Sequence, residues 1–188
     1  AIYNNGTVIL NGGSYTRSAE ASTSIKDANG NSYYNILNHG TMTIGKNVSV
    51  TSRGSFSSLI ANGYYNFSDT NPEVVMFPEQ IRKLRVSQST QAAIQNNHVA
   101  TINGGTFDAK ANHAIENRHF DGGHNTGSVT VTSGTFTGGL YTTTGATWSI
   151  SGGTFSSDPS VYVVGNGSAN IVKRAGSEGA YTYTVLAK

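Results

Sequence analysis

The sequence predicts an all-β fold, a parallel β-helix of about six coils with two projecting insertions and a closing β-hairpin. Three observations lead to this prediction: an apolar repeat with a period near 21 residues, a composition rich in turn-forming residues, and few charges. The 188 residues include 23 Gly, 22 Ser, 22 Thr and 19 Asn, but only 12 Lys+Arg, 10 Asp+Glu and 3 Pro. This composition favours a folded domain over collagen or a charged disordered chain, and it disfavours an all-helical core.

The first repeated unit is an Ile followed two residues later by an Asn. A repeat at regular spacing indicates stacked structural units, so it decides the architecture before any local feature does. The unit occurs five times, at Ile2/Asn4, Ile36/Asn38, Ile60/Asn62, Ile94/Asn96 and Ile115/Asn117.

The second repeated unit is an apolar residue followed five positions later by an aromatic one. The Ile of the first unit lies eight positions before the apolar residue of the second, and the aromatic lies eight positions before the next Ile. With the five positions inside the second unit, one turn takes 21 residues, as from Ile94 to Ile115. Three short strands with Gly or Asn corners per turn are typical of a β-helix coil. Leu140 completes the count as a degenerate sixth member. The second unit spans Leu10–Tyr15, Ile102–Phe107, Val131–Phe136 and Ile150–Phe155.

Two spacings of 34 residues, from Ile2 to Ile36 and from Ile60 to Ile94, exceed the period and predict insertions. We expect them at residues 17–32 and 64–79. Within 78–84 a short helix starting at Pro78 competes with a strand, and the repeat spacing favours the strand.

The C-terminal residues 165–188 depart from the repeat. Alternation from Ala180 to Val185 after two glycines predicts a hairpin that caps coils 1–164, since an open end would expose strand edges and core. The N-terminal end shows no such cap, and we expect the chain to be a piece of a longer protein.

The runs Ile150–Val163 and Ile102–Phe107 resemble the repeats of large secreted surface proteins of Gram-positive bacteria. The resemblance implies a pectate-lyase-like right-handed β-helix, an adhesin-like role, and a secreted or cell-surface location with the export signal and anchor outside this sequence. The strand Tyr181–Val185 is similar to the one that ends such modules.

Most repeated residues have structural interpretations. We expect the Asn residues to stack at a coil corner and bond to their own copies, and the Gly pairs at 12/13, 104/105 and 152/153 to form corners rather than phosphate cradles. An internal aromatic stack is expected of Tyr15, Phe107, Phe136 and Phe155.

Two groups of residues are candidates for function. The first is a set of aromatics that we expect outside the core register, where ring faces beside hydroxyls and amides suit sugar rings. The second is a polar stretch with imidazole and carboxylate groups for metal or acid/base chemistry, although it lacks the spacing of known metal motifs. The aromatic set is Tyr33, Tyr34, Tyr64, Tyr65 and Trp148, and the polar set is His113, Glu116, His119, Asp121 and His124.

These observations favour a non-enzymatic module that binds a host glycan, a mucin or another polysaccharide along its lateral face. A polysaccharide lyase or glycoside hydrolase is an alternative, but the acidic residues include no adjacent pair. A stalk or phage-fibre spacer without a ligand is another, and trimer formation would favour it. The net charge of +2 argues against nucleic-acid binding, and we expect no cofactor, metal or membrane insertion.

Overall fold

The computed structural model describes residues 2–4, 6–17, 34–52, 58–63, 98–120, 125–164, 170–176 and 180–186. These residues form twelve strands and one 3-10 helix, η2 (Ser160–Tyr162), and contain no α-helix. The all-β class predicted from the sequence is confirmed. The strands are β1 (Ile2–Asn4), β2 (Thr7–Arg17), β3 (Tyr34–Asn38), β4 (Thr41–Ser52), β5 (Ser58–Asn62), β6 (His98–Asn117), β7 (His119–Phe120), β8 (Asn125–Thr142), β9 (Thr147–Ile150), β10 (Gly153–Phe155), β11 (Ile171–Ala175) and β12 (Tyr181–Val185).

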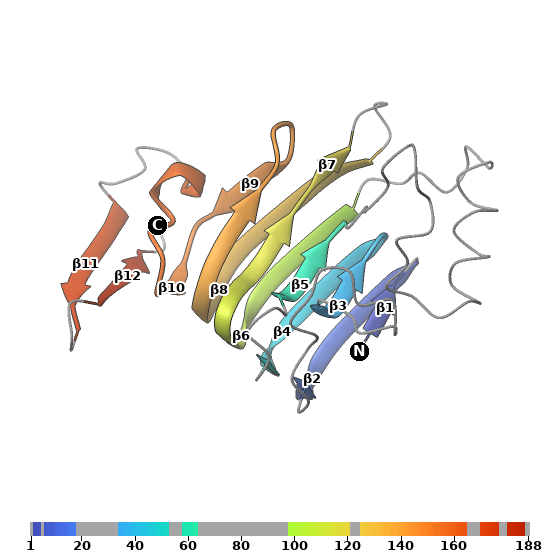
Figure 1. Ribbon diagram of the computed structural model, residues 1–188, viewed down its shortest axis with the longest axis horizontal. Coiled ribbons are helices and arrows are strands. Elements are labelled where there is room, and N and C mark those ends of the chain that lie inside the picture. The colour runs from blue at the N-terminus through green and yellow to red at the C-terminus, as the bar shows by residue number, and fades with distance from the viewer. Residues whose placement is uncertain are drawn as a thin grey trace.

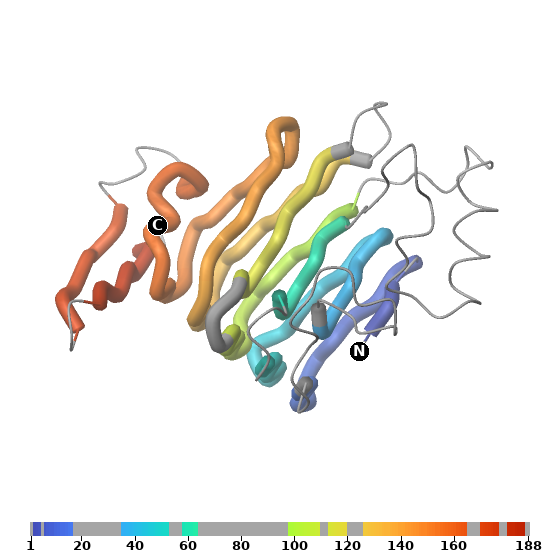
Figure 2. Tube along the Cα trace, in the orientation of Figure 1, coloured from blue at the N-terminus to red at the C-terminus, as the bar shows by residue number. Residues whose placement is uncertain are grey.

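Pairing between these strands is mostly parallel. β1, β3, β5, β6 and β8 lie side by side in that order, and β2, β4, β6, β8 and β9 form a second parallel series. The long strands β6 and β8 belong to both series because different parts of each one pair with different neighbours. Figures 1 and 2 show the described strands following one another along the long axis, from β1 and β2 at one end to β11 and β12 at the other.

The core consists of side chains that recur at the same register position in successive strands. One ladder joins Ile2, Ile36, Ile60, Ile115 and Leu140. Another stacks Phe107 on Phe136 and Phe136 on Phe155, with ring centroids 4.8 Å apart in both pairs and planes within 7°. Each phenylalanine is at most 1% exposed, so the expected aromatic stack is confirmed for these three rings.

Tyr15 occupies the same column but does not join the stack. Its register partner is Val50, and Val50 pairs in turn with Phe107. The Tyr15 hydroxyl instead donates to the carbonyl oxygen of Gly12 at 3.2 Å. The column therefore begins with an aromatic at the end of the sheet, where its polar tip can stay near solvent.

The buried asparagines form a ladder of amide hydrogen bonds, as the sequence predicts. Each Nδ2 donates to the next Oδ1: Asn4 to Asn38 at 2.6 Å, Asn38 to Asn62 at 2.8 Å, and Asn62 to Asn117 at 3.0 Å. The last Nδ2 donates to the carbonyl oxygen of Thr147 at 2.8 Å. Because buried amides must be paired, the ladder satisfies its own polar groups and fixes the corner.

Glycine is required where the chain turns into the phenylalanine column. Gly105 and Gly153 adopt φ values of +101° and +116°, which side-chain-bearing residues rarely tolerate. A Cβ at Gly105 would lie 2.8 Å from the carbonyl oxygen of Val48. The Gly pairs at these positions are thus corners, as expected.

The number of rungs differs from the prediction. Ile60 pairs directly with Ile115, and the Asn62 amide bonds to Asn117, so these residues and not the predicted Ile94 and Asn96 form the next rung, and the ladder has five members among the described residues. Spacing alone misled the prediction, since the offset of eight positions from Ile94 to Ile102 matches the repeat. Residues 64–97, including the ambiguous segment 78–84, lie outside the described residues, as do residues 18–33 of the first insertion.

Antiparallel strands complete the C-terminal end. β12 pairs with β10 and with β11, so Val185 faces Gly153 on one side and Ile171 on the other. Val185 is 4% exposed and joins the core, while Ile150 makes an isolated parallel bridge to Val163. The last parallel strand is therefore not left as an open edge within this part of the chain.

Candidate functional site

The predicted site residues are divided between the described structure and the rest of the chain. Tyr33, Tyr64, Tyr65, Asp121 and His124 lie outside the described residues. Tyr34 begins β3, but only its backbone is described. The remaining candidates are Trp148, His113, Glu116 and His119.

Glu116 is the centre of a polar cluster on β6. Its carboxylate is 9% exposed, and Oε1 accepts a 2.5 Å hydrogen bond from the Ser58 hydroxyl and lies 3.4 Å from His113 Nδ1. Oε2 accepts hydrogen bonds from Arg118 Nε at 3.0 Å and from a terminal guanidinium nitrogen at 2.7 Å. The guanidinium also lies over the Tyr141 ring, 4.7 Å from its centroid. His113 and Glu116 were predicted as site residues from the sequence, but Ser58 was not. Ser58 is 58 positions away from Glu116 and reaches it because β5 pairs with β6.

The electrostatics of this cluster favour a fixed carboxylate over a catalytic one. Burial would raise the pKa of Glu116, but the hydrogen bond with His113, the charge of Arg118 and the hydrogen bond from Ser58 together lower the pKa to about 2. Such a carboxylate is a weak base near neutral pH and is never protonated there to act as an acid. Ser58 donates to Glu116 and not to His113, so no base activates the serine hydroxyl.

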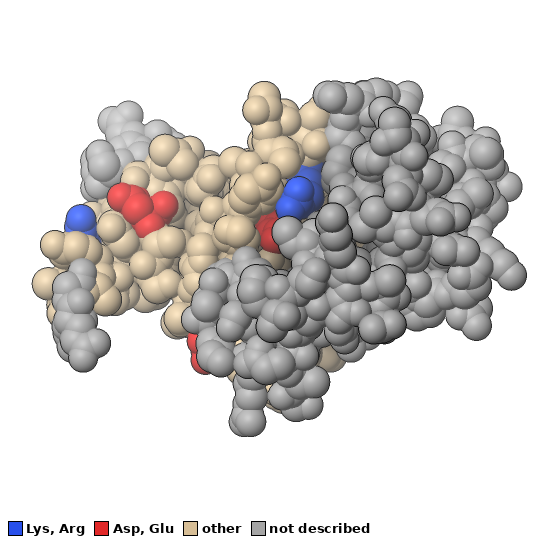
Figure 3. All heavy atoms as spheres, in the orientation of Figure 1, with Lys and Arg blue, Asp and Glu red and all other residues tan. Residues whose placement is uncertain are grey.

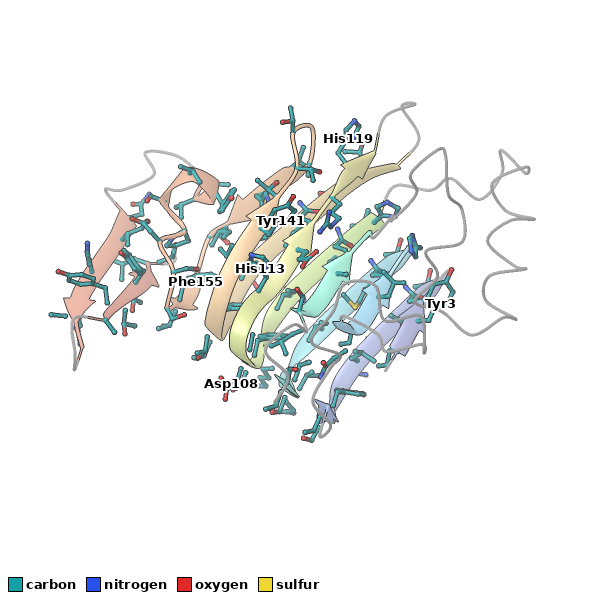
Figure 4. The ribbon with its side chains drawn as sticks, viewed as in Figure 1. Tyr3, Asp108, His113, His119, Tyr141 and Phe155 are labelled. Atoms are coloured by element: carbon teal, nitrogen blue, oxygen red, sulfur yellow. The ribbon has the colours of Figure 1, made fainter. Side chains whose placement is uncertain are left out.

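His119 lies apart from this cluster. Figure 4 shows His113 beside Tyr141 midway along the strands, in keeping with their ring contact at 5.3 Å, whereas His119 lies at the upper end of the strands. Its Nδ1 is 3.2 Å from the Thr126 hydroxyl, and its backbone N–H donates to the Thr143 hydroxyl at 2.6 Å. His119 therefore lies apart from His113 and Glu116, and no group of three metal-ligating side chains occurs in the described ranges.

Thr143 belongs to a corner that lines a cavity of about 390 Å³. The corner, residues 142–146, contributes three threonines, and a turn closes it with a hydrogen bond from the Ala146 N–H to the Thr143 carbonyl oxygen at 3.1 Å. Gly145 has φ +91°, and a Cβ there would lie 2.5 Å from His119 Cδ2. His119 thus holds the backbone of the cavity wall in place.

Two stacked aromatic rings also line the cavity. Trp148 and Tyr162 have centroids 4.7 Å apart and planes at 29°, and Val161 lies beside them at 84% exposure. Trp148 Nε1 is buried and makes no hydrogen bond within the described chain. Burial raises the pKa of Tyr162, so its hydroxyl stays protonated and able to donate near neutral pH.

The position of Trp148 corrects one expectation. Trp148 pairs with Val129 in the column of Ala100 and Met42, so its ring lies in the core register and packs on the core. It is only half-covered because it is the last member of that column. Tyr162 then lies against it through η2, which follows a turn where Asp158 Oδ1 accepts from the Ser160 N–H at 3.0 Å. The sequence analysis missed Tyr162, and the aromatic within Val161–Val163 just after the last repeat was the available signal.

The cavity carries no charged side chain. Its lining consists of the corner 142–146 with Trp148, Val161 and Tyr162. Figure 3 shows that acidic and basic atoms are sparse on the described part of this face. Aromatic faces beside hydroxyl groups provide stacking and hydrogen bonds for an uncharged polar ligand, and they provide no counter-ion for a charged one.

The chain matches no protein-family model, no curated protein and no solved structure. Among the described residues, no helix is both long enough and apolar enough to cross a membrane.

Proposed function

We propose that this chain is a coiled, right-handed parallel β-helix that acts as a non-enzymatic glycan-binding module of a secreted or cell-surface adhesin. The coil is supported by strands β6 and β8, each of which pairs in parallel with strands of two series, and by the continuous asparagine and phenylalanine columns. The right hand follows from the resemblance and from the general preference of parallel crossovers.

The observation that carries the binding proposal is the uncharged cavity beside Trp148 and Tyr162. Ring faces and threonine hydroxyls occur together there, and a volume of about 390 Å³ accommodates one or two sugar rings. Neutral hexose units fit this lining better than uronates or sialic acids, since a carboxylate would find no cation in it.

The polysaccharide-cleaving alternative draws no support from the described carboxylates. Glu116 is engaged on both oxygens, and Asp158 accepts hydrogen bonds from Ser160. In Figure 4 Asp108 lies at the opposite end of the strands from His119, away from the Glu116 cluster near His113. A binding role needs none of these groups in a reactive state.

The test is a glycan array with neutral and acidic oligosaccharides, followed by titration of any hit. Tyr162→Ala removes the outer ring of the stack and should abolish binding to a neutral glycan. Tyr181→Ala is the matched control because Tyr181 is 45% exposed on β12 and does not line the cavity. Trp148→Phe keeps an aromatic in the core column and should weaken binding without unfolding the chain.

Two results would contradict the proposal. Silence of the wild-type chain across the array would favour the spacer alternative. Loss of binding in Tyr64→Ala/Tyr65→Ala together with full binding in Tyr162→Ala would move the sugar site to the second insertion and reject the cavity.

A further inference from the structure

The sheet formed by β2, β4, β6, β8 and β9 carries a regular array on its outer face, which we call the hydroxyl array. Its inner face holds the buried column that includes Met42 and Val129, so the residues on either side of each inner one point outward. The outward positions align in two columns by the register of the strands. One column is Thr7, Thr41, Val99, Ser128 and Thr147, and the other is Ile9, Thr43, Thr101, Thr130 and Ser149.

The composition of the hydroxyl array is uniform. Eight of its ten positions are Thr or Ser, and the other two, Ile9 and Val99, are β-branched like threonine. None of the ten is charged or aromatic. Each position is exposed or half-buried, and Ile9 at 62% is among the most exposed large apolar residues described.

Most of these hydroxyls are not used inside the protein. Thr147 Oγ1 lies 3.5 Å from the carbonyl oxygen of Gly127, at the limit of a hydrogen bond. In the described structure the side-chain hydroxyls of Thr43, Thr101 and Thr130 make no hydrogen bond. They are therefore available to water or to a ligand across the whole width of the array.

Packing alone does not require this repetition. On the neighbouring strands around the asparagine ladder, the residue between Ile and Asn differs from rung to rung: Tyr3 is half-buried and Tyr141 is exposed, whereas Leu37, Ala61 and Glu116 are buried. Threonine is a good strand former, but an outer face can take many polar residues. A two-dimensional repeat on the outside indicates a partner that itself repeats in two dimensions.

The geometry points to ice as that partner, and we propose that the hydroxyl array is an ice-binding surface. Parallel strands set a spacing of about 4.8 Å between array members, and alternate residues along a strand are about 6.6 Å apart. These two repeats lie close to the oxygen repeats on the prism face of hexagonal ice. Threonine presents a hydroxyl and a methyl group together, which orders water at lattice positions and also removes apolar surface from liquid water on contact.

Other repeating partners fit the hydroxyl array less well. Crystalline polysaccharides are bound through flat aromatic rings, which the array lacks. A charged mineral face would require carboxylates or ammonium groups. The array contains no residue that lines the Trp148 and Tyr162 cavity, since Trp148 is an inward residue of β9 and the array residues of that strand point outward. The two activities can therefore be tested independently.

Ice-affinity purification and ice recrystallisation assays of the 188-residue chain test this proposal. The wild-type chain should be incorporated into a growing ice front and should stop the coarsening of ice grains. Thr130→Tyr, on β8 between Thr101 and Ser149 of the array, should abolish both effects because a bulky ring lifts the surface off the lattice. Thr101→Val keeps the shape and the methyl group and should keep most of the activity.

Thr135→Tyr is the matched control. Thr135 is an exposed threonine on the same strand β8, in a second Ser/Thr column that includes Thr106 and Thr154 but is adjoined by the exposed charge of Asp108. Its activity should equal the wild type, and circular dichroism should be the same for all variants. Exclusion of the wild-type chain from ice would overturn the proposal, as would full activity of Thr130→Tyr or loss of activity in Thr135→Tyr alone.

Discussion

At the asparagine corner, the Asn side chains repeat from strand to strand, whereas the residues that precede them vary. Inside, the same residue returns in each of four successive strands, because each Asn amide is satisfied by its own copy in the next strand. On the opposite side, the residue between Ile and Asn changes from Tyr3 to Leu37, Ala61 and Glu116, of which the last three are buried. Repetition inside is imposed by packing and pairing, whereas each residue before the Asn responds to its own surroundings.

The hydroxyl array reverses this rule, because there the outer face repeats. The core does not impose this repeat, and the proposed ice partner rests on it. The Glu116 cluster, which occurs once, carries instead an inference about local stability.

The largest expected effect comes from breaking the inner ladder. Asn62 is fully buried and bonds to Asn38, Asn117 and the carbonyl oxygens of His98 and Ser128. Asn62→Ala leaves several buried polar groups unpaired and should lower the free energy of unfolding by about 3 to 5 kcal/mol, measured by urea denaturation.

Asn47→Ala is the control for this prediction. Asn47 is exposed on β4, so its substitution should change the free energy of unfolding by no more than about 0.5 kcal/mol. An equal loss in the two variants would show that the ladder is not a special source of stability.

The same contrast explains what could be predicted from the sequence. The inner columns recur at fixed spacing, so the all-β class, the asparagine ladder and the Phe107 to Phe155 stack could be predicted without a structure. Ile94 could not be rejected, because a single matching spacing does not show which strand lies beside which. Ser58 and Arg118 meet Glu116 only through strand pairing and a local side-chain contact, and no period marks such pairs.

A smaller effect is expected at His98, which is 2% exposed and whose carbonyl oxygen accepts from the Asn62 amide. Burial lowers the pKa of His98 to about 4 from its ordinary value of 6.5, and a backbone hydrogen bond with His39 opposes this in part. The unfolded chain therefore takes up a proton before the folded chain does, and stability present above pH 6.5 is lost as the pH falls toward 4. The difference between the two pKa values corresponds to about 3 kcal/mol.

Denaturation curves at pH 7, 5.5 and 4 should show this loss. His98→Gln removes the titrating group, so its free energy of unfolding should depend less on pH across that range, whatever its absolute value. If the slope against pH is the same in the variant and the wild type, buried His98 is not the source of the acid sensitivity.

An effect similar in size to that of His98 is expected at Glu116, which is charged, buried and well paired. Glu116→Gln keeps an acceptor for the Ser58 hydroxyl but gives Arg118 a neutral partner, so the cost at pH 7 should be about 3 kcal/mol. Because the folded pKa of Glu116 is about 2, below the ordinary 4.5, the wild type should lose this contribution as the pH falls from 4.5 to 2. The variant and the wild type should therefore converge in stability at low pH. A gap that stays constant down to pH 2 would mean that the carboxylate acts through packing and not through its charge, and the residue before the Asn would then follow the same rule as the Asn itself.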